Sequence, residues 1–201
     1  MAVITAAEAR FYLRGLTGTG EDTDIATCVT RVDAALAAWL GFPPRDEATD
    51  PTLEDVSYVL YLDGPGGLVV QSPVWPIQSV TSIYDDPDRS YDAASLVAAT
   101  DYDLDKPVGK IILSNSAVWG SWSSSWRAIK LTVVAGWTTI PERLKHAVGL
   151  TVRHQWRARD LAGVETMTGS SGMSASLRPF TILPEVQQLL AADRLPGGWV
   201  G

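Results

Sequence analysis

The sequence is poor in the side chains that most often carry chemistry. Cys28 is the only cysteine in 201 residues, so an internal disulfide and a cysteine-based zinc site are both excluded. The two histidines, His146 and His154, are eight residues apart and do not form the adjacent pair that binds a metal on one helix face. These shortages argue against a metalloenzyme and against a disulfide-stabilised secreted domain.

Positive charge and long apolar runs are also scarce. Sixteen Lys and Arg stand against 23 Asp and Glu, a net charge of −7. An acidic chain repels DNA, so affinity-driven binding of nucleic acid is not expected. The apolar runs are too short to span a membrane, and the N-terminus lacks the pattern of a signal peptide. We therefore expect a soluble protein, made in the cytoplasm, with no membrane contact.

Motifs for catalysis or ion binding are incomplete. Asp101, Asp103 and Asp105 resemble the start of a calcium loop, but Lys106 and Ile112 stand where Gly and Glu are needed. The three carboxylates are therefore interpreted as a solvated strand edge. The Gly-rich stretches 64–67 and 169–172 lack the residues of a phosphate-binding loop and of a nucleophile elbow. We predict no catalytic residue, no metal ligand and no cofactor; an unrecognised hydrolase is an alternative without a supporting motif.

Tryptophan is abundant by contrast, with eight residues. Trp119, Trp122 and Trp126 lie in one segment whose Gly and Ser content favours a loop. Aromatic residues are enriched at interfaces, so these three form a candidate contact patch for a neighbouring subunit, or, less favoured, for a sugar. The alternative is that the loop folds over a sheet and buries its rings.

The order of periodic patterns predicts helices at both ends and strands between them. A capping box at Thr5 and Glu8 predicts a helix to about Arg14, and apolar steps of three and four predict another that ends at Gly41. About six short strands are expected in 53–137, including residues 128–135, where apolar and polar side chains alternate.

The third zone is again helical. A helix should begin at Pro141 and continue to about residue 160; 163–176 has no periodicity and is interpreted as a mobile loop, and Pro184 should open a last short helix. The predicted fold class is α+β: a helical bundle core formed by 1–42 and 138–162, an inserted small antiparallel β domain at 53–137, and an extended C-terminal arm at 163–201.

The long helix from Pro141 carries a basic face. Helical projection brings five side chains together: Arg143, His146, Arg153, His154 and Arg157. Cationic neighbours disfavour a metal, so we interpret this face as solvated or as a contact with an acidic partner surface or a passing phosphate.

The order of these segments resembles the phage head–tail connector (adaptor) family and its relatives in gene transfer agents, over almost the full length. The motifs that carry the resemblance are Ile4–Arg10, Asp24-Ile25, Ser72-Pro73-Val74 with Pro76–Asp85, Tyr102–Asp105 leading into Gly109–Leu113, Ile129–Trp137 followed by Ile140-Pro141, and Leu183–Val186 with Leu189, Leu190 and Arg194. The long 163–178 stretch and the Trp-rich loop depart from the family pattern.

The resemblance implies a virion protein of the neck, assembled in the bacterial cytoplasm. It implies a dodecameric ring of copies beneath the portal protein, a downstream neck or tail protein as a further partner, and DNA that passes through the lumen without sequence-specific binding. Alternatives are another neck or tail-completion protein, or a carbohydrate-binding module.

The resemblance also implies a C-terminal segment that reaches the portal or a neighbouring subunit. Its candidate partner-binding residues are Leu177, Phe180, Ile182, Leu183, Val186, Leu189, Leu190, Arg194 and Trp199. Because each contact in a closed ring joins two different surfaces, the arm and the helical body are expected to supply one surface each.

Overall fold

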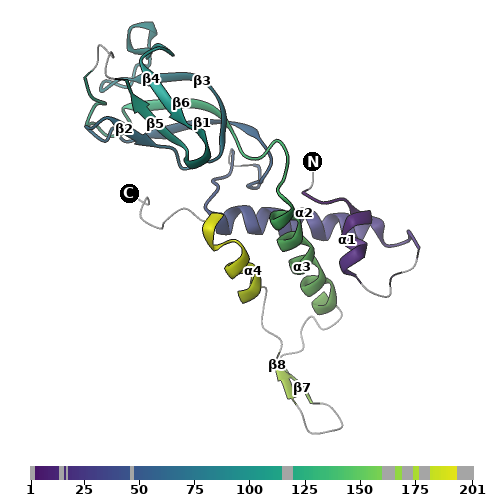
Figure 1. The fold of residues 1–201 in the computed structure, drawn as a ribbon. Helices are drawn as coiled ribbons and strands as arrows, with labels where there is room; N and C mark the ends of the chain where they lie inside the picture. The colour runs from purple at the N-terminus through teal and green to yellow at the C-terminus, as the bar shows by residue number, and fades with distance from the viewer. Residues whose placement is uncertain are drawn as a thin grey trace. The chain divides into compact units, whose positions relative to one another are not determined.

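The computed structural model describes residues 3–13, 16, 18–45, 48–114, 120–159, 166–168, 174–176 and 182–193, the two triplets by their backbone alone. The chain forms two compact units (Figure 1). One, the helical unit, takes its described residues from 1–40 and 140–193; the other, the β unit, takes them from 41–139. Helices and small antiparallel sheets together confirm the predicted α+β class.

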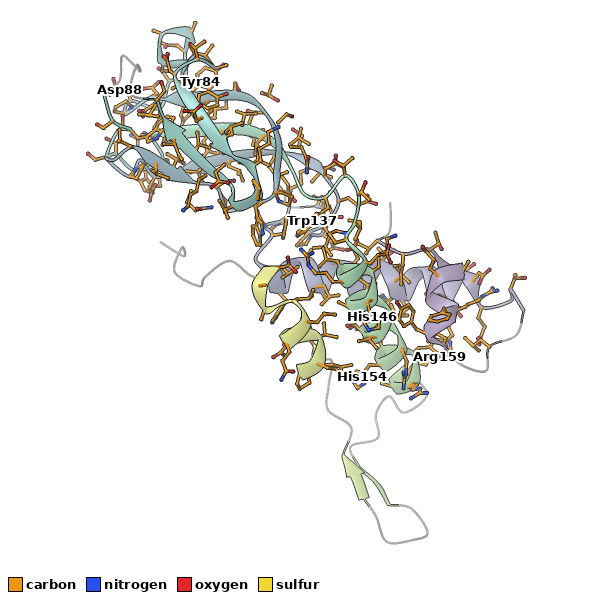
Figure 2. The ribbon with its side chains drawn as sticks, viewed as in Figure 1. Tyr84, Asp88, Trp137, His146, His154 and Arg159 are labelled. Carbon is orange, nitrogen blue, oxygen red and sulfur yellow. The ribbon has the colours of Figure 1, made fainter. Side chains whose placement is uncertain are left out.

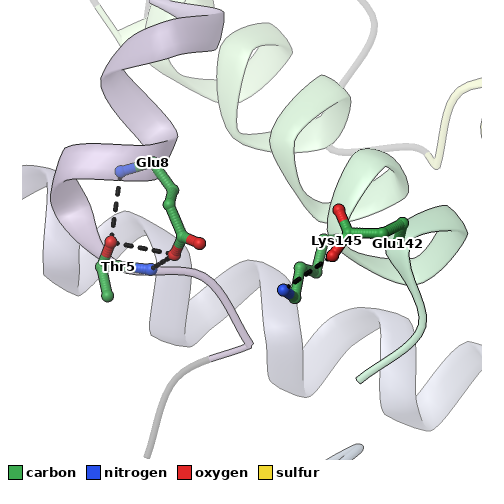
Figure 3. A network of polar contacts seen from close by, with 4 residues as sticks. All are labelled: Thr5, Glu8, Glu142 and Lys145. Atoms are coloured by element: carbon green, nitrogen blue, oxygen red, sulfur yellow. Dashed lines mark hydrogen bonds and ion pairs between the residues drawn. The ribbon is translucent and has the colours of Figure 1, made fainter. Parts of the chain in front are cut away.

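The first helix of the helical unit, α1 (Ala6–Tyr12), begins at the predicted capping box (Figure 3). The backbone N–H of Thr5 donates to the Glu8 carboxylate at 2.7 Å, and the N–H of Glu8 donates to the Thr5 hydroxyl at 3.2 Å. These bonds satisfy donors that a helix start otherwise leaves unpaired. The backbone N–H of Thr5, followed by its hydroxyl, lowers the pKa of Glu8.

Three helices pack together in this unit: α1, α2 (Asp22–Leu40) and α3 (Glu142–Arg159). Their buried side chains recur every three or four residues, as a helix needs in order to bury one face. Those of α2 and α3 include Ile25, Val29, Val32, Leu36, Leu40, Leu144, Ala147, Val148 and Val152. A Cβ added at Gly149 would lie 2.3 Å from the Tyr12 ring, so glycine lets α1 approach α3 closely.

The C-terminal part of the helical unit contains more structure than the sequence predicted. Within the stretch interpreted as a mobile loop, β7 (Thr166–Thr168) pairs antiparallel with β8 (Ser174–Ser176), which corrects that interpretation. A two-stranded hairpin rests on backbone hydrogen bonds, which leave no apolar period in a sequence. The predicted short helix is α4 (Pro184–Leu189), followed by η3 (Ala191–Asp193), and α4 packs against α3.

The β unit has two three-stranded antiparallel sheets. The first has the order β1-β6-β3, and the second has the order β2-β5-β4. The strands are β1 (Val56–Leu62), β2 (Val69–Gln71), β3 (Ile77–Asp85), β4 (Tyr102–Asp105), β5 (Lys110–Leu113) and β6 (Ile129–Ala135), with the short helices η1 (Ala93–Ser95) and η2 (Lys106–Val108) between them. Every strand expected in this region is present.

The central strand β6 has two unlike faces, as its alternation predicted. Ile129, Leu131 and Val133 are fully buried, whereas Lys130 and Thr132 lie on the outer face. Because β1 and β3 both pair with β6, each outward residue of β6 has a neighbour on either side. The apolar face forms the core of the unit, and the other face remains open for contacts.

One end of the β unit is closed by aromatic rings. Phe42 stacks on Trp75 with ring centroids 4.8 Å apart, and Trp137 lies 5.7 Å from Phe42. Phe42 and Trp75 are buried, so these rings belong to the core. Figure 2 shows Trp137 at this end of the unit, and Tyr84 and Asp88 at the opposite end.

Candidate functional site

The predicted C-terminal contact residues divide into described and undescribed groups. Leu177, Phe180, Arg194 and Trp199 lie outside the described residues. Val186 and Leu190 are fully buried in the helical unit and Ile182 nearly so, which corrects their prediction as anchors for a partner. These side chains are buried because α4 packs on α3. A short helix with one apolar face is stable only when another element covers that face. Leu183 is half-buried, and Leu189 is exposed.

The Trp-rich segment is split in the same way. Trp119 lies outside the described residues. Trp122 is 1% exposed, and its indole N–H donates to the carbonyl of Leu68 at 3.1 Å. The prediction of Trp122 as a contact residue is therefore wrong: its ring is core, and the segment folds over the sheet. Trp126 is 62% exposed and lies on the surface.

The basic face of α3 is partly engaged within its own unit. Arg143 donates two hydrogen bonds to the Asp193 carboxylate, at 2.7 and 2.5 Å, and this partner raises the pKa of Arg143. The Nδ1 atom of His146 lies 3.3 Å from the Tyr12 hydroxyl. These two residues hold α1 and the C-terminal turn against α3.

The other three residues of that face are Arg153, His154 and Arg157, and they are at least partly exposed to solvent. Arg157 is exposed, and Arg153 and His154 are half-buried; Figure 2 marks the place of His154 on α3. They remain the part of the predicted basic face that is open to a partner.

A surface that the sequence did not predict lies at the Tyr84 end of the β unit. Seven basic and aromatic side chains follow one another there, and we call them the cation–aromatic ladder. In spatial order they are Arg89, Trp126, Arg127, Tyr61, Tyr91, Lys130 and Tyr84. Successive members are 5.5, 5.4, 4.8, 5.6, 5.4 and 5.7 Å apart, each measured to a ring centroid. Such contacts contribute about 0.5–1 kcal/mol each at exposed sites.

Strand register builds the centre of the ladder. Lys130 of β6 is paired with Tyr61 of β1 on one side and with Tyr84 of β3 on the other. The three side chains therefore form a row across the outer face of the sheet. Trp126 and Arg127 immediately precede β6, so the same strand brings them to this row.

The loop after β3 supplies the remaining members and is organised by Asp86. The Asp86 carboxylate accepts hydrogen bonds from the Asp88 N–H at 2.8 Å, the Ser90 hydroxyl at 2.7 Å and the Tyr91 N–H at 2.6 Å. The Ser90 hydroxyl, followed by the amides of Tyr91, Asp88 and Arg89, lowers the pKa of Asp86. One carboxylate thus fixes the loop that carries Arg89 and Tyr91.

A second carboxylate fixes the segment before β6. The backbone N–H of Arg127 donates to Asp63 at 2.7 Å, and the Tyr91 hydroxyl donates to the Arg127 carbonyl at 2.6 Å. Tyr91 thereby joins the two segments through its side chain. The pKa of the Tyr91 hydroxyl is raised by burial.

The sequence hid this surface because its members come from four separate segments. Their positions form no period, and only the strand order β1-β6-β3 brings Tyr61 and Tyr84 to the two sides of Lys130. The adjacent pair Trp126-Arg127 was the one local signal, since Trp and Arg are enriched at protein interfaces.

Three further properties of the described residues concern metals, membranes and thiol chemistry. Among them, no group of three or more His, Cys, Asp or Glu is placed to hold a metal ion. None of the described helices is long and apolar enough to cross a membrane. Burial raises the pKa of the Cys28 thiol, which disfavours the reactive thiolate.

Comparison with known proteins gives a likeness in structure but not in sequence. No family model and no curated protein matches the chain. A chain in the neck of an empty gene transfer agent (GTA) particle, computed with C6 symmetry, is similar with a TM-score of 0.59 and 20% identity, over 99% of this chain and 93% of that one.

Two further solved structures agree. A chain of the virion of a native GTA particle has a TM-score of 0.57 at 20% identity, over 99% of this chain and 93% of that one. A chain of the neck of a native GTA particle, computed with C12 symmetry, has a TM-score of 0.57 at 18% identity, over 98% and 91%. The chain therefore has the fold of a GTA neck protein, and the predicted resemblance is confirmed at the level of the fold.

Proposed function

We propose that the chain is a structural head–tail connector subunit of a phage-type neck. In this proposal it forms a ring beneath the portal protein, joins the capsid to the tail and has no catalytic activity. The supporting observation is the likeness to GTA neck chains over nearly the whole length of both partners.

Ring assembly is supported by the symmetry of the similar particles. Two of the similar chains come from necks computed with C6 and C12 symmetry. In a cyclic ring each copy meets the next through two different surfaces. The cation–aromatic ladder and the open part of the basic face of α3 are candidates for such contacts.

The charge of the chain suits a passage for DNA rather than a binding site. A net charge of −7 disfavours tight, sequence-independent adhesion to phosphate. A lumen lined by such subunits lets DNA slide, and in this proposal the chain reads no base sequence.

The proposal is tested by mixing the purified chain with the portal protein of the same particle and imaging the complex by negative-stain electron microscopy. We expect an added ring of density on one side of the portal, absent from images of either protein alone. Binding to a different neck or tail protein instead indicates a tail-completion role, and failure to bind any of them overturns the proposal.

A truncation after Asp193 is the matched variant for the arm. It keeps Val186 and Leu190, which the helical unit needs, together with the Arg143–Asp193 pair. If the C-terminal segment grips the portal or a neighbour, the truncated chain stays folded by circular dichroism and loses its place on the portal. Unchanged docking of the folded truncation contradicts a role for the last eight residues, 194–201.

A further inference from the structure

The cation–aromatic ladder has the chemistry of a protein-binding surface. Its members are tyrosine, tryptophan and arginine with one lysine, and the first three are the residue types that dominate the binding energy of protein interfaces. Trp126 is 62% exposed and Tyr61 is 42% exposed, so large apolar surfaces face solvent there. A surface of this composition gains free energy when a partner covers it.

The ladder is also held in a fixed shape before any partner arrives. Among the described residues, the non-glycine residues with a left-handed backbone are Arg89, Tyr91 and Arg127, with φ of 63°, 50° and 50°, and all three belong to the ladder. Such backbones are unfavourable for residues that carry a side chain, and they persist where the surroundings enforce them. The hydrogen bonds of Asp86 and Asp63 are that enforcement. Preorganisation of this kind lowers the entropy lost on binding.

The basic members of the ladder call for an anionic partner. Within the described part of the chain, no ion pair involves Arg89, Arg127 or Lys130. Arg127 is placed between the rings of Tyr61 and Trp126, and Lys130 between those of Tyr84 and Tyr91. The rings fix these cations while their N–H groups stay able to donate to carboxylates.

Two features favour a protein over DNA as that partner. Basic groups lie over the rings, which removes ring faces on which exposed bases would stack. The flanking segments also carry three exposed aspartates: Asp63, Asp88 and Asp92. A phosphate backbone is charged at every step and meets these carboxylates, whereas a protein edge with a few charges can be placed between them.

The β unit itself carries a surface with the complementary charge. Asp103 and Asp105 lie on β4, an edge strand of its sheet, and their side chains are exposed; Asp101 precedes the strand and is half-buried. Alternate residues of a strand share one face and are about 6.5–7 Å apart. In the described part of the chain no ion pair involves Asp103 or Asp105. The two exposed carboxylates of this edge can pair with cations of the ladder.

The Asp105 end of this edge lies away from the ladder, whereas residues 96–98 connect the preceding Asp101 to the Tyr84 end of β3. Lys106, next to Asp105, donates to the carbonyl of Gln78 at 3.0 Å, and the Gln78 amide donates to the Gly136 carbonyl at 2.7 Å. Asp105 is therefore next to a residue that contacts the start of β3, and Tyr84 lies at the other end of that strand. Two complementary surfaces at different places on one subunit are what a head-to-tail contact between copies requires.

We propose that the cation–aromatic ladder binds the acidic edge formed by Asp103 and Asp105 on β4 of a neighbouring copy of this chain. The inference rests on the proposed ring and names the contact between β units that closes it. Arg127 and Lys130 pair with carboxylates of the neighbour, and Trp126 and Tyr61 cover the apolar surface around them.

Charge reversal tests the contact on the full chain assembled on the portal. Arg127→Glu and Asp103→Arg should each reduce the number of copies bound at limiting concentration, with apparent affinity falling on the order of tenfold or more. The double variant should recover most of the loss. Arg31→Glu, the same charge change at an exposed position of α2 outside both surfaces, is the matched control.

A second variant separates binding from folding. Arg127 has a left-handed backbone, so its replacement is checked by circular dichroism, and Lys130→Glu on the regular strand β6 repeats the reversal without that strain. The inference is overturned if Arg127→Glu and Lys130→Glu both bind the portal in the same number of copies as the wild type. It is also overturned if the double variant Arg127→Glu/Asp103→Arg binds no more copies than the weaker of its two single variants. If the ladder variants lose affinity for duplex DNA while rings form normally, the ladder is a DNA surface and the inference is wrong.

Cysteine cross-linking distinguishes this failure from failure of the proposed function. In a Cys28→Ser background, Trp126→Cys with Asp103→Cys should give covalent multimers on mild oxidation, and each single cysteine should not. Rings without these multimers overturn the inference and leave the connector function standing. If no ring forms on the portal, the same pair in the concentrated free chain decides: multimers support the contact, and their absence overturns both proposals.

Discussion

The two ends of the β unit use the same residue types for different purposes. At one end Phe42 contacts both Trp75 and Trp137, and Phe42 and Trp75 are buried. At the other end Tyr61, Tyr84, Tyr91 and Trp126 alternate with cations and stay partly exposed. Rings packed on rings stabilise the fold, whereas rings interleaved with basic groups keep a polar, solvated surface that a partner can cover. A count of aromatic residues therefore says little until the neighbours of each ring are known.

The largest effect is expected at the buried end. Phe42→Ala removes a ring that is 3% exposed and stacked on Trp75, so unfolding of the β unit should cost about 3–5 kcal/mol less than in the wild type. Denaturant titration with hydrogen exchange of β1 and β6 peptides measures the change. Phe11→Ala, at a ring that is 84% exposed, should change stability by about 0.5 kcal/mol or less. Equal effects at the two positions contradict the packing described for Phe42.

An intermediate effect is expected at Asp86, which supports the exposed end. Asp86→Asn removes the charge from a group that accepts three hydrogen bonds, so exchange of the Asp88 and Tyr91 amides should rise by roughly tenfold at neutral pH. The rest of the β unit should stay protected. If Asp86→Asn raises amide exchange equally at both ends of the β unit, the loop does not open independently of the rest of the unit.

Asp86→Asn also tests how the stability of this loop depends on pH. Because the pKa of Asp86 is lower in the folded chain than its ordinary 3.8, its charged form stabilises the loop above about pH 4. That contribution falls as the pH drops through the folded pKa. Amide protection, corrected for intrinsic rates, should therefore decrease in acid in the wild type and change less in Asp86→Asn.

The smallest effect on stability is expected at Trp126. Its exposed ring contacts Arg89 and Arg127, so Trp126→Ala should lower the free energy of unfolding by about 1 kcal/mol or less. Trp122→Ala, four residues earlier, is the matched control and should cost several times more, because it empties a buried site and removes one of the two hydrogen bonds that the Leu68 carbonyl accepts. Similar losses at the two positions contradict the assignment of one ring to the core and the other to the surface.

Local patterns predicted the elements well because local forces create them. The capping box at Thr5, the apolar stripe of 25–40 and the alternation of 129–135 are each complete within one element. The connector-like fold came from the resemblance of the ordered segments, since pattern alone reaches only an α+β class.

What the sequence did not predict depends on contacts between distant segments. The ladder depends on the strand order β1-β6-β3, and this order cannot be predicted from the sequence of any single strand. For the same reason the burial of Val186 was missed, and the sequence did not decide between burial and exposure of Trp122: a short terminal helix and a Gly/Ser-rich loop look unattached until the surface that receives them is known. The pairing of β7 with β8 had no apolar pattern to reveal it.

The place of β6 at the centre of its sheet has a consequence for the order of events during synthesis. Both β1 and β3 hydrogen-bond to β6, the last of the six strands to leave the ribosome. The sheet therefore stays open, and the row of Tyr61, Lys130 and Tyr84 does not exist, until nearly all of 41–139 has been translated. A nascent chain thus cannot present the finished ladder to another copy. If the ladder binds a neighbouring copy as proposed, this topology delays that contact until the subunit is nearly complete, which guards against premature association on the polysome.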